Sequence, residues 1–194
     1  MAIDIIIQFV EGKLPVDDFL DNLYNNKELE STLSENIALD SYIGGNLHLF
    51  LLEQDLTTQA GIVNSIGALK SFLTFKKIAF TENEEASKLH LLLLKAQPSW
   101  LYIPSWYMKE LLALANGKKG NELEKFLKEE IKRRFRYLKK APKWVQSPEW
   151  VFENGKPLIF IAQNDITAIR HDNAQLYIFF DENNNTFHFV EQTS

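Results

Sequence analysis

The chain has 194 residues, of which 45 % are hydrophobic and 24 % are charged, and its formal net charge is −5. This length and composition predict a single folded domain over 1–194 with a core of ordinary size. The absence of cysteine excludes disulfides, thiolate metal sites and a cysteine nucleophile.

The sequence also predicts a cytoplasmic protein that does not associate with membranes. No apolar run approaches the roughly 18 residues that a membrane-spanning helix requires. The apolar start of the chain carries Asp4 and no basic residue before Lys13, so the basic region that opens a signal peptide is missing.

Charge is distributed unevenly along the chain. Residues 1–100 hold 7 basic and 14 acidic residues, whereas residues 109–143 hold 12 basic and 5 acidic residues, a net charge of +7. A basic segment within an acidic chain indicates a region that could bind a negatively charged partner.

Residues 1–140 are expected to form a mainly helical body. Apolar residues recur at intervals of three or four, as at Phe19, Leu20 and Leu23 after Pro15, and again throughout 59–73. This spacing places apolar side chains on one face of a helix.

One phrase, Pro-x-Trp-x-x-x-Pro-x-Trp, occurs at 98–106 and again at 142–150, and the two copies hold all four tryptophans. Proline fixes the backbone, and an indole buries a large apolar surface together with one donor. We expect rigid connections whose tryptophans anchor a core, although these rings could also stack on a base or a sugar.

The longest helix is expected to open near residue 121 and to run to about Leu138. Apolar residues from Leu123 to Phe135 form one stripe of this helix, and Arg134 falls on that side, where we expect an ion pair. The opposite stripe is cationic and is the predicted partner-binding surface: Lys125, Lys128, Lys132, Arg136 and Lys139. The alternative for these cations is a solvated helix face.

After Pro142 the apolar period changes to two, which predicts strands at 157–162, 175–180 and 186–191. The fold class is therefore expected to be α+β: a helical part over 1–140, and a β part over 141–194 with a small antiparallel sheet at about 150–192. In the last strand we expect Phe187 and Phe189 to face the core and His188 to face solvent.

The sequence carries no recognisable catalytic motif. It has neither a glycine-rich phosphate loop nor a Gly-x-Ser-x-Gly turn, and its four histidines lack metal-ligand spacing. We therefore predict no catalytic, cofactor or metal site. An enzyme of unrecognised type is an alternative, in which His171 and Asp165 would converge in a cleft between the helical body and the sheet.

The C-terminal third resembles the core of the YwqG-like family of bacterial, mostly uncharacterised proteins. The resemblance is carried by Trp144-Val-Gln146, by the strand that ends at Gln163 with Asp165 after it, and by the aromatic strand that ends at Asp181. It implies a bacterial protein and no catalytic residues. Small, compact bacterial families of this kind include immunity proteins that neutralise toxins, an association rather than a mechanism.

These observations favour a non-enzymatic bacterial binding protein, and more specifically a toxin-neutralising immunity protein whose partner is a protein toxin. A nucleic-acid-binding module that uses the basic helix 121–140 is a further alternative. Acidic residues along that helix, including Glu122, Glu124 and Glu129, weaken the nucleic-acid interpretation.

Overall fold

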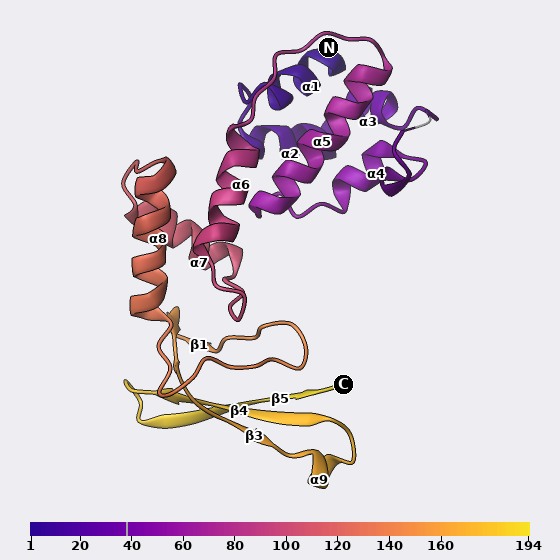
Figure 1. Cartoon of the computed structure of the whole chain (residues 1–194). Helices are drawn as coiled ribbons and strands as arrows, with labels where there is room; N and C mark the ends of the chain where they lie inside the picture. Colours follow the sequence, from indigo (N-terminus) through magenta and orange to yellow (C-terminus); the bar gives the residue numbers. More distant parts are fainter. Residues whose placement is uncertain (38) are drawn as a thin grey trace. The chain divides into compact units, whose positions relative to one another are not determined.

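The computed structural model describes residues 1–37 and 39–194, and the chain forms two compact units, Met1–Leu91 and Leu92–Ser194 (Figure 1). Helices precede a C-terminal antiparallel sheet, so the predicted α+β class is confirmed. The boundary between the units falls inside α6 (Glu85–Ala96), well before the change from helices to strands near residue 140. The expectation of one domain over 1–194 stays a prediction.

Unit 1 is helical and has its own apolar core. Its helices are α1 (Ala2–Val10), α2 (Val16–Asn25), α3 (Lys27–Leu33), α4 (Leu47–Leu52), α5 (Gln59–Phe75) and the first part of α6. The rings of Phe9 and Phe19 stack with centroids 3.8 Å apart, and Leu69 and Phe72 of α5 are fully buried. Burial of these apolar faces is the main stabilisation that unit 1 has.

Unit 2 combines helices with two small sheets. Its elements after α6 are α7 (Ser105–Leu114), α8 (Gly120–Arg134), β1 (Phe152–Glu153), β2 (Lys156–Pro157), β3 (Ile159–Asp165), α9 (Thr167–Arg170), β4 (Ala174–Asp181) and β5 (Thr186–Thr193). Strands β3, β4 and β5 form an antiparallel sheet in that order. Strands β1 and β2 pair across Asn154 and Gly155, which both have positive φ, as a tight hairpin turn requires.

The two tryptophan phrases meet in the core of unit 2. The Trp144 indole donates to the Trp100 carbonyl oxygen at 2.7 Å, and the Trp150 indole donates to the Leu158 carbonyl oxygen at 2.9 Å. The ring of Trp150 lies 5.5 Å from that of Trp100 and 5.4 Å from that of Phe179. Trp150 is buried, Trp100 and Trp144 are half-buried and Trp106 is 48 % exposed, so the expected role as a core anchor is confirmed for Trp150 but not for Trp106.

Helix α8 is shorter than predicted. It has 15 residues and ends at Arg134. The longer helix is α5, which has 17 residues. After the end of α8 the chain pairs with β3. The Leu138 amide donates to the Phe160 carbonyl oxygen, and the Phe160 amide donates to the Arg136 carbonyl oxygen, both at 3.0 Å. This pairing with a distant segment overrides the local helical pattern.

The faces of β5 are also opposite to the prediction. Phe187 and Phe189 are exposed, at 56 % and 62 %, whereas His188 and Val190 are half-buried. The register pairs His188 with Phe179, which is fully buried in the core. Because residues paired across two strands share a face, the inward direction of Phe179 decides which side of β5 is buried.

Candidate functional site

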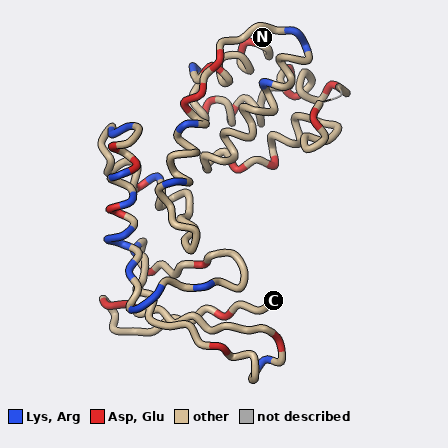
Figure 2. The backbone as a smooth tube through the Cα atoms, viewed as in Figure 1, with Lys and Arg blue, Asp and Glu red and all other residues tan. Residues whose placement is uncertain are grey.

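The five predicted partner-binding residues do not form a single stripe. Figure 2 shows Lys and Arg positions along α8 and on the segment that follows it. Lys125, Lys128 and Lys132 lie on α8, but Arg136 and Lys139 come after its end, so the prediction of one continuous cationic stripe is wrong. Pairing of this segment with β3 is the reason, because it takes both residues off the helix.

Three of these five residues are instead brought together around one pocket of about 600 Å³ in unit 2. They are Lys128, Lys132 and Arg136. Lys125 lines a neighbouring depression that also contains Glu124 and Glu129, and Lys139 lines neither. We call the larger pocket the α8 groove; its lining is Lys95, Ala96, Gln97, Pro98, Trp100, Lys128, Ile131, Lys132, Phe135, Arg136 and Tyr137.

The walls of the α8 groove are apolar and aromatic. Trp100 and Tyr137 meet edge to face, with centroids 5.6 Å apart, and the almost fully buried Phe135 also belongs to the lining. Gln97 fixes the connection that carries Trp100, since its side-chain oxygen accepts from the Ile103 amide at 3.1 Å. The Tyr137 side chain remains 43 % exposed, so an apolar group of a partner could contact it directly.

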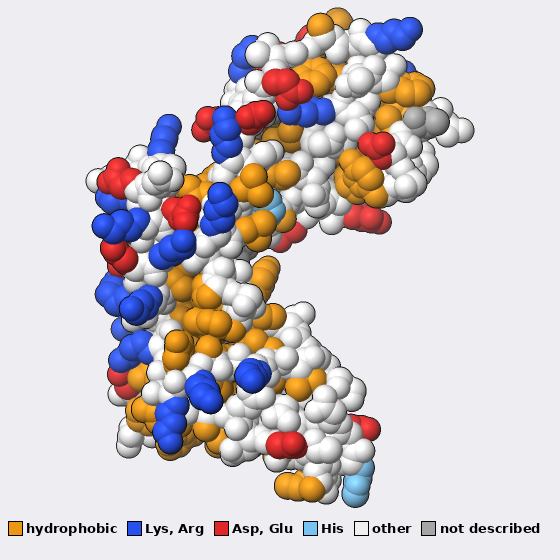
Figure 3. All heavy atoms as spheres, viewed as in Figure 1, with side chains coloured by type: hydrophobic (Ala, Val, Ile, Leu, Met, Phe, Trp, Pro, Cys, Tyr) orange, Lys and Arg blue, Asp and Glu red, His pale blue; other side chains and the backbone are white. Residues whose placement is uncertain are grey.

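The charges that line the α8 groove are all positive. They come from Lys95, Lys128, Lys132 and Arg136, and none of the described residues that line the groove carries a carboxylate. Figure 3 shows Lys and Arg side chains over α8 next to a band of hydrophobic side chains.

Two of these four cations already have acidic partners elsewhere. Lys128 pairs with Glu124 at 2.6 Å, and Arg136 pairs with Glu182. Lys95 and Lys132 make no ion pair within residues 1–37 and 39–194. The hydrogen bond from Lys128, aided by the charges of Lys128 and Lys95, lowers the pKa of Glu124, which is consistent with a positive field along this side of α8.

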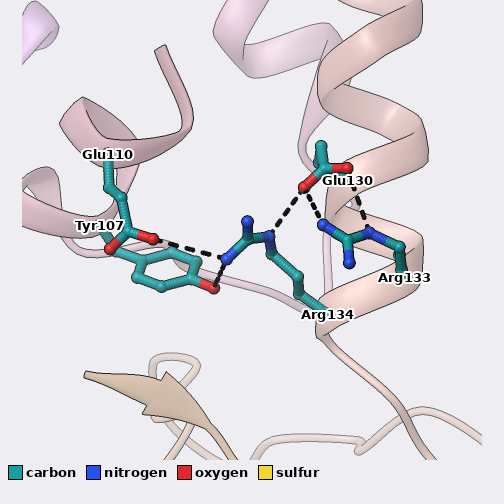
Figure 4. Close-up of polar contacts among 5 residues, drawn as sticks. All are labelled: Tyr107, Glu110, Glu130, Arg133 and Arg134. Atoms are coloured by element: carbon teal, nitrogen blue, oxygen red, sulfur yellow. Dashed lines mark hydrogen bonds and ion pairs between the residues drawn. The ribbon is translucent and has the colours of Figure 1, made fainter. Parts of the chain in front are cut away.

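Arg134, which we expected in an ion pair, has one. Its Nε donates to Glu130 at 2.8 Å, and its Nη1 donates to the Tyr107 hydroxyl at 3.0 Å and lies 3.5 Å from Glu110 (Figure 4). Burial lowers the pKa of Arg134, but the hydrogen bonds to Glu130 and Tyr107 outweigh it and raise the pKa overall. The predicted ion pair is therefore confirmed.

His48 and His171 have different surroundings, one buried and the other exposed. His48 is buried and its Nε2 lies 3.0 Å from the Leu23 carbonyl oxygen. Asp165 and His171 flank α9 as exposed residues, and the Asp165 carboxylate accepts from the Thr167 amide at 2.9 Å. Across the described ranges 1–37 and 39–194, no three His, Asp or Glu side chains are grouped so that they could hold a metal ion.

Sequence reasoning missed Lys95, Trp100 and Tyr137 as members of the site. They come from α6, from the first tryptophan phrase and from the segment after α8, and only the fold brings them to α8. The one signal in the sequence is the doubled tryptophan phrase, whose rings could stack on a base or a sugar.

No protein-family model, curated protein or solved structure matches this chain. Within the described residues, no helix combines the length and apolar character needed to cross a membrane.

Proposed function

We propose that this protein is a non-enzymatic binding protein of a bacterial cytoplasm, and that the α8 groove holds an acidic segment of a protein partner. The observation that supports this most directly is the combination of aromatic walls with four cations and no carboxylate in the lining. Aromatic anchors supply much of the energy of protein interfaces, and complementary charge speeds association and selects the partner.

The groove suits a segment in which a carboxylate flanks an apolar side chain. Lys95 and Lys132, which have no ion pair within residues 1–37 and 39–194, are free to meet the carboxylates. The apolar side chain would rest against Tyr137 and Trp100. Within this proposal the partner is a toxin and the protein is its immunity protein. Neutralisation of a toxin requires a stable scaffold with a face of complementary charge, and the α8 groove provides such a face.

The test compares two charge reversals on the same helix. Lys132→Glu changes the α8 groove, whereas Lys125→Glu makes the same change of charge at an exposed position outside it. The tagged wild-type chain is used to recover a partner from its own cells, and association rates are then measured with the purified partner. We expect Lys132→Glu to slow association about tenfold at low salt and Lys125→Glu to have little effect.

A third variant separates packing from charge. Tyr137→Ala removes an aromatic wall without altering charge, and we expect it to speed dissociation by about tenfold. Thermal unfolding of all variants controls for folding. Recovery of no protein partner, or equal kinetics for Lys132→Glu and Lys125→Glu, would contradict the proposal.

Single-stranded nucleic acid is the second candidate, favoured by the same pairing of aromatic rings with cations. It ranks lower because Glu124 and Glu129 lie beside the groove on α8. Binding of a labelled oligonucleotide that falls steeply as salt rises, and that Lys132→Glu weakens, would favour this candidate; absence of binding in dilute salt would exclude it.

A further inference from the structure

A second pocket of unit 2, of about 410 Å³, lies where the end of α8 meets the sheet. We call it the arginine pocket. Its cationic lining consists of Arg133, Arg134, Arg136 and Lys156. It differs in composition from the α8 groove, with which it shares only Arg136.

Arg134 is held in a fixed position in this pocket. Glu130 and the Tyr107 hydroxyl bind its Nε and Nη1, and Tyr107 itself is 1 % exposed (Figure 4). The guanidinium also lies over the Tyr107 ring at 5.8 Å from its centroid. A guanidinium held in this way has lost its rotamer freedom before a ligand arrives, which lowers the entropic cost of binding.

The carboxylates in and beside the pocket already have donors. Asp181 accepts from the Asn183 amide at 2.8 Å and from the Asn184 side chain at 2.7 Å. Glu182 pairs with Arg136, and Glu130 accepts from both Arg133 and Arg134. Glu130 and Glu182 therefore neutralise part of the charge of the three guanidiniums, whereas Asp181 takes no donor from them.

Several cationic donors, in contrast, have no acceptor among the residues that the structure describes. Arg133 uses Nε and Nη2 on Glu130, and Arg134 uses Nε and Nη1. The remaining nitrogens, Arg133 Nη1, Arg134 Nη2 and Lys156 Nζ, have no hydrogen-bond acceptor within residues 1–37 and 39–194. Because a guanidinium offers five N–H donors and an ammonium three, the pocket has more donors than its own carboxylates use.

The other side of the pocket is apolar. Ile159 and Phe180 are paired across β3 and β4, are half-buried and both line the pocket. A volume of about 410 Å³ is at the small end of the range for pockets that hold small molecules.

We propose that the arginine pocket binds a small organic anion: an oxyanion group, carboxylate or phosphate, carried on a compact apolar body. The oxyanion would accept hydrogen bonds from Lys156 and from the unused nitrogens of Arg133 and Arg134. The apolar body would lie against Ile159 and Phe180. The arginine pocket and the α8 groove share Arg136, but Lys132 lines only the groove, so a change at Lys132 tests the partner-binding function separately.

The test uses the full chain and three probes: phenyl phosphate, benzoate and the uncharged phenol. Binding is followed by amide chemical shifts in NMR titrations. We expect both anions to shift the amides of Lys156, Leu158 and Ile159 and those of 180–183, and phenol to shift them far less. Lys156→Gln should weaken binding of the anions about fivefold, since it removes one charge-assisted hydrogen bond, which an exposed lysine makes only weakly.

Lys139→Gln removes the same charge at an exposed position outside the pocket and serves as the matched control. It should leave the affinity within about twofold, as should Lys132→Glu. The proposal would be overturned if neither anion binds, if phenol binds equally well, or if Lys139→Gln weakens binding as much as Lys156→Gln. Because the shifts also locate the ligand on the wild-type chain, the test does not depend on the variants alone.

Discussion

Asp181 is fully buried, and amides rather than a cation hold its charge. It ends β4, and its carboxylate accepts hydrogen bonds from the amides and side chains of Asn183 and Asn184 in the turn that follows. The Asn183 backbone amide makes the largest contribution to lowering the pKa of Asp181. The ionised form is therefore the one that stabilises the β4–β5 turn.

This assignment predicts the pH dependence of stability. A carboxyl group whose pKa is lower in the folded state stabilises the fold above its unfolded pKa of about 3.9, and this stabilisation disappears as pH falls through the folded pKa. Asp181→Asn should thus lower the unfolding temperature at pH 7, and the difference from wild type should narrow below about pH 4. Thermal unfolding of both proteins from acid to neutral pH measures this, and a difference that is constant with pH would contradict it.

At the scale of elements, strand β5 buries the face opposite to the one that its sequence pattern predicts. Phe179 of β4 is fully buried, whereas Phe189 of β5 is 62 % exposed. We expect Phe179→Ala to cost about 3–5 kcal/mol of unfolding free energy, because it leaves a cavity, and Phe189→Thr to cost less than about 1 kcal/mol. Urea unfolding of the two variants measures both values, and the reverse order would mean that β5 presents its other face to the core.

The existence of most elements could be predicted from local periodicity, but their ends and faces could not. Alternating residues predicted β3, β4 and β5, yet the buried face of β5 depends on its register with Phe179. The residues of α8 up to Ile131 follow a helical period, yet its end depends on backbone pairing with Phe160, which lies far along the chain. Both features depend on tertiary contacts that a local pattern does not contain.

Only some residues of the candidate site could be predicted from the sequence. Lys128, Lys132 and Arg136 follow from the density of basic residues in one segment. Lys95 could not be linked to them, since it stands alone at the end of α6 in an acidic half of the sequence. An excess of one charge in a segment therefore indicates where partners could bind, but the walls of the groove come from residues brought there by folding.

At the scale of the whole molecule, the two units have separate sets of buried residues. The core of unit 1 is built from residues 2–73, and it includes Leu69 of α5. Leu127 of α8 is fully buried in unit 2. A compact unit with its own core can open without unfolding the rest of the chain.

Leu69→Ala and Leu127→Ala should therefore have local effects. Each should cost about 2–5 kcal/mol, and each should speed amide hydrogen exchange in its own unit while leaving the slowest exchange of the other unit unchanged. Residue-resolved hydrogen exchange measures this. A uniform loss of protection over both units would show that they unfold as one cooperative structure.

The meeting of the two tryptophan phrases has an optical consequence. All four tryptophans lie in Leu92–Ser194, and the other unit has none. Intrinsic indole fluorescence is therefore a reporter of this unit alone. Trp100 lines the α8 groove, and the ring of Trp150 lies next to that of Trp100 in the core. Both rings therefore emit close to the surface where a partner would bind. The chain carries a spectroscopic probe of its own candidate site, without any label.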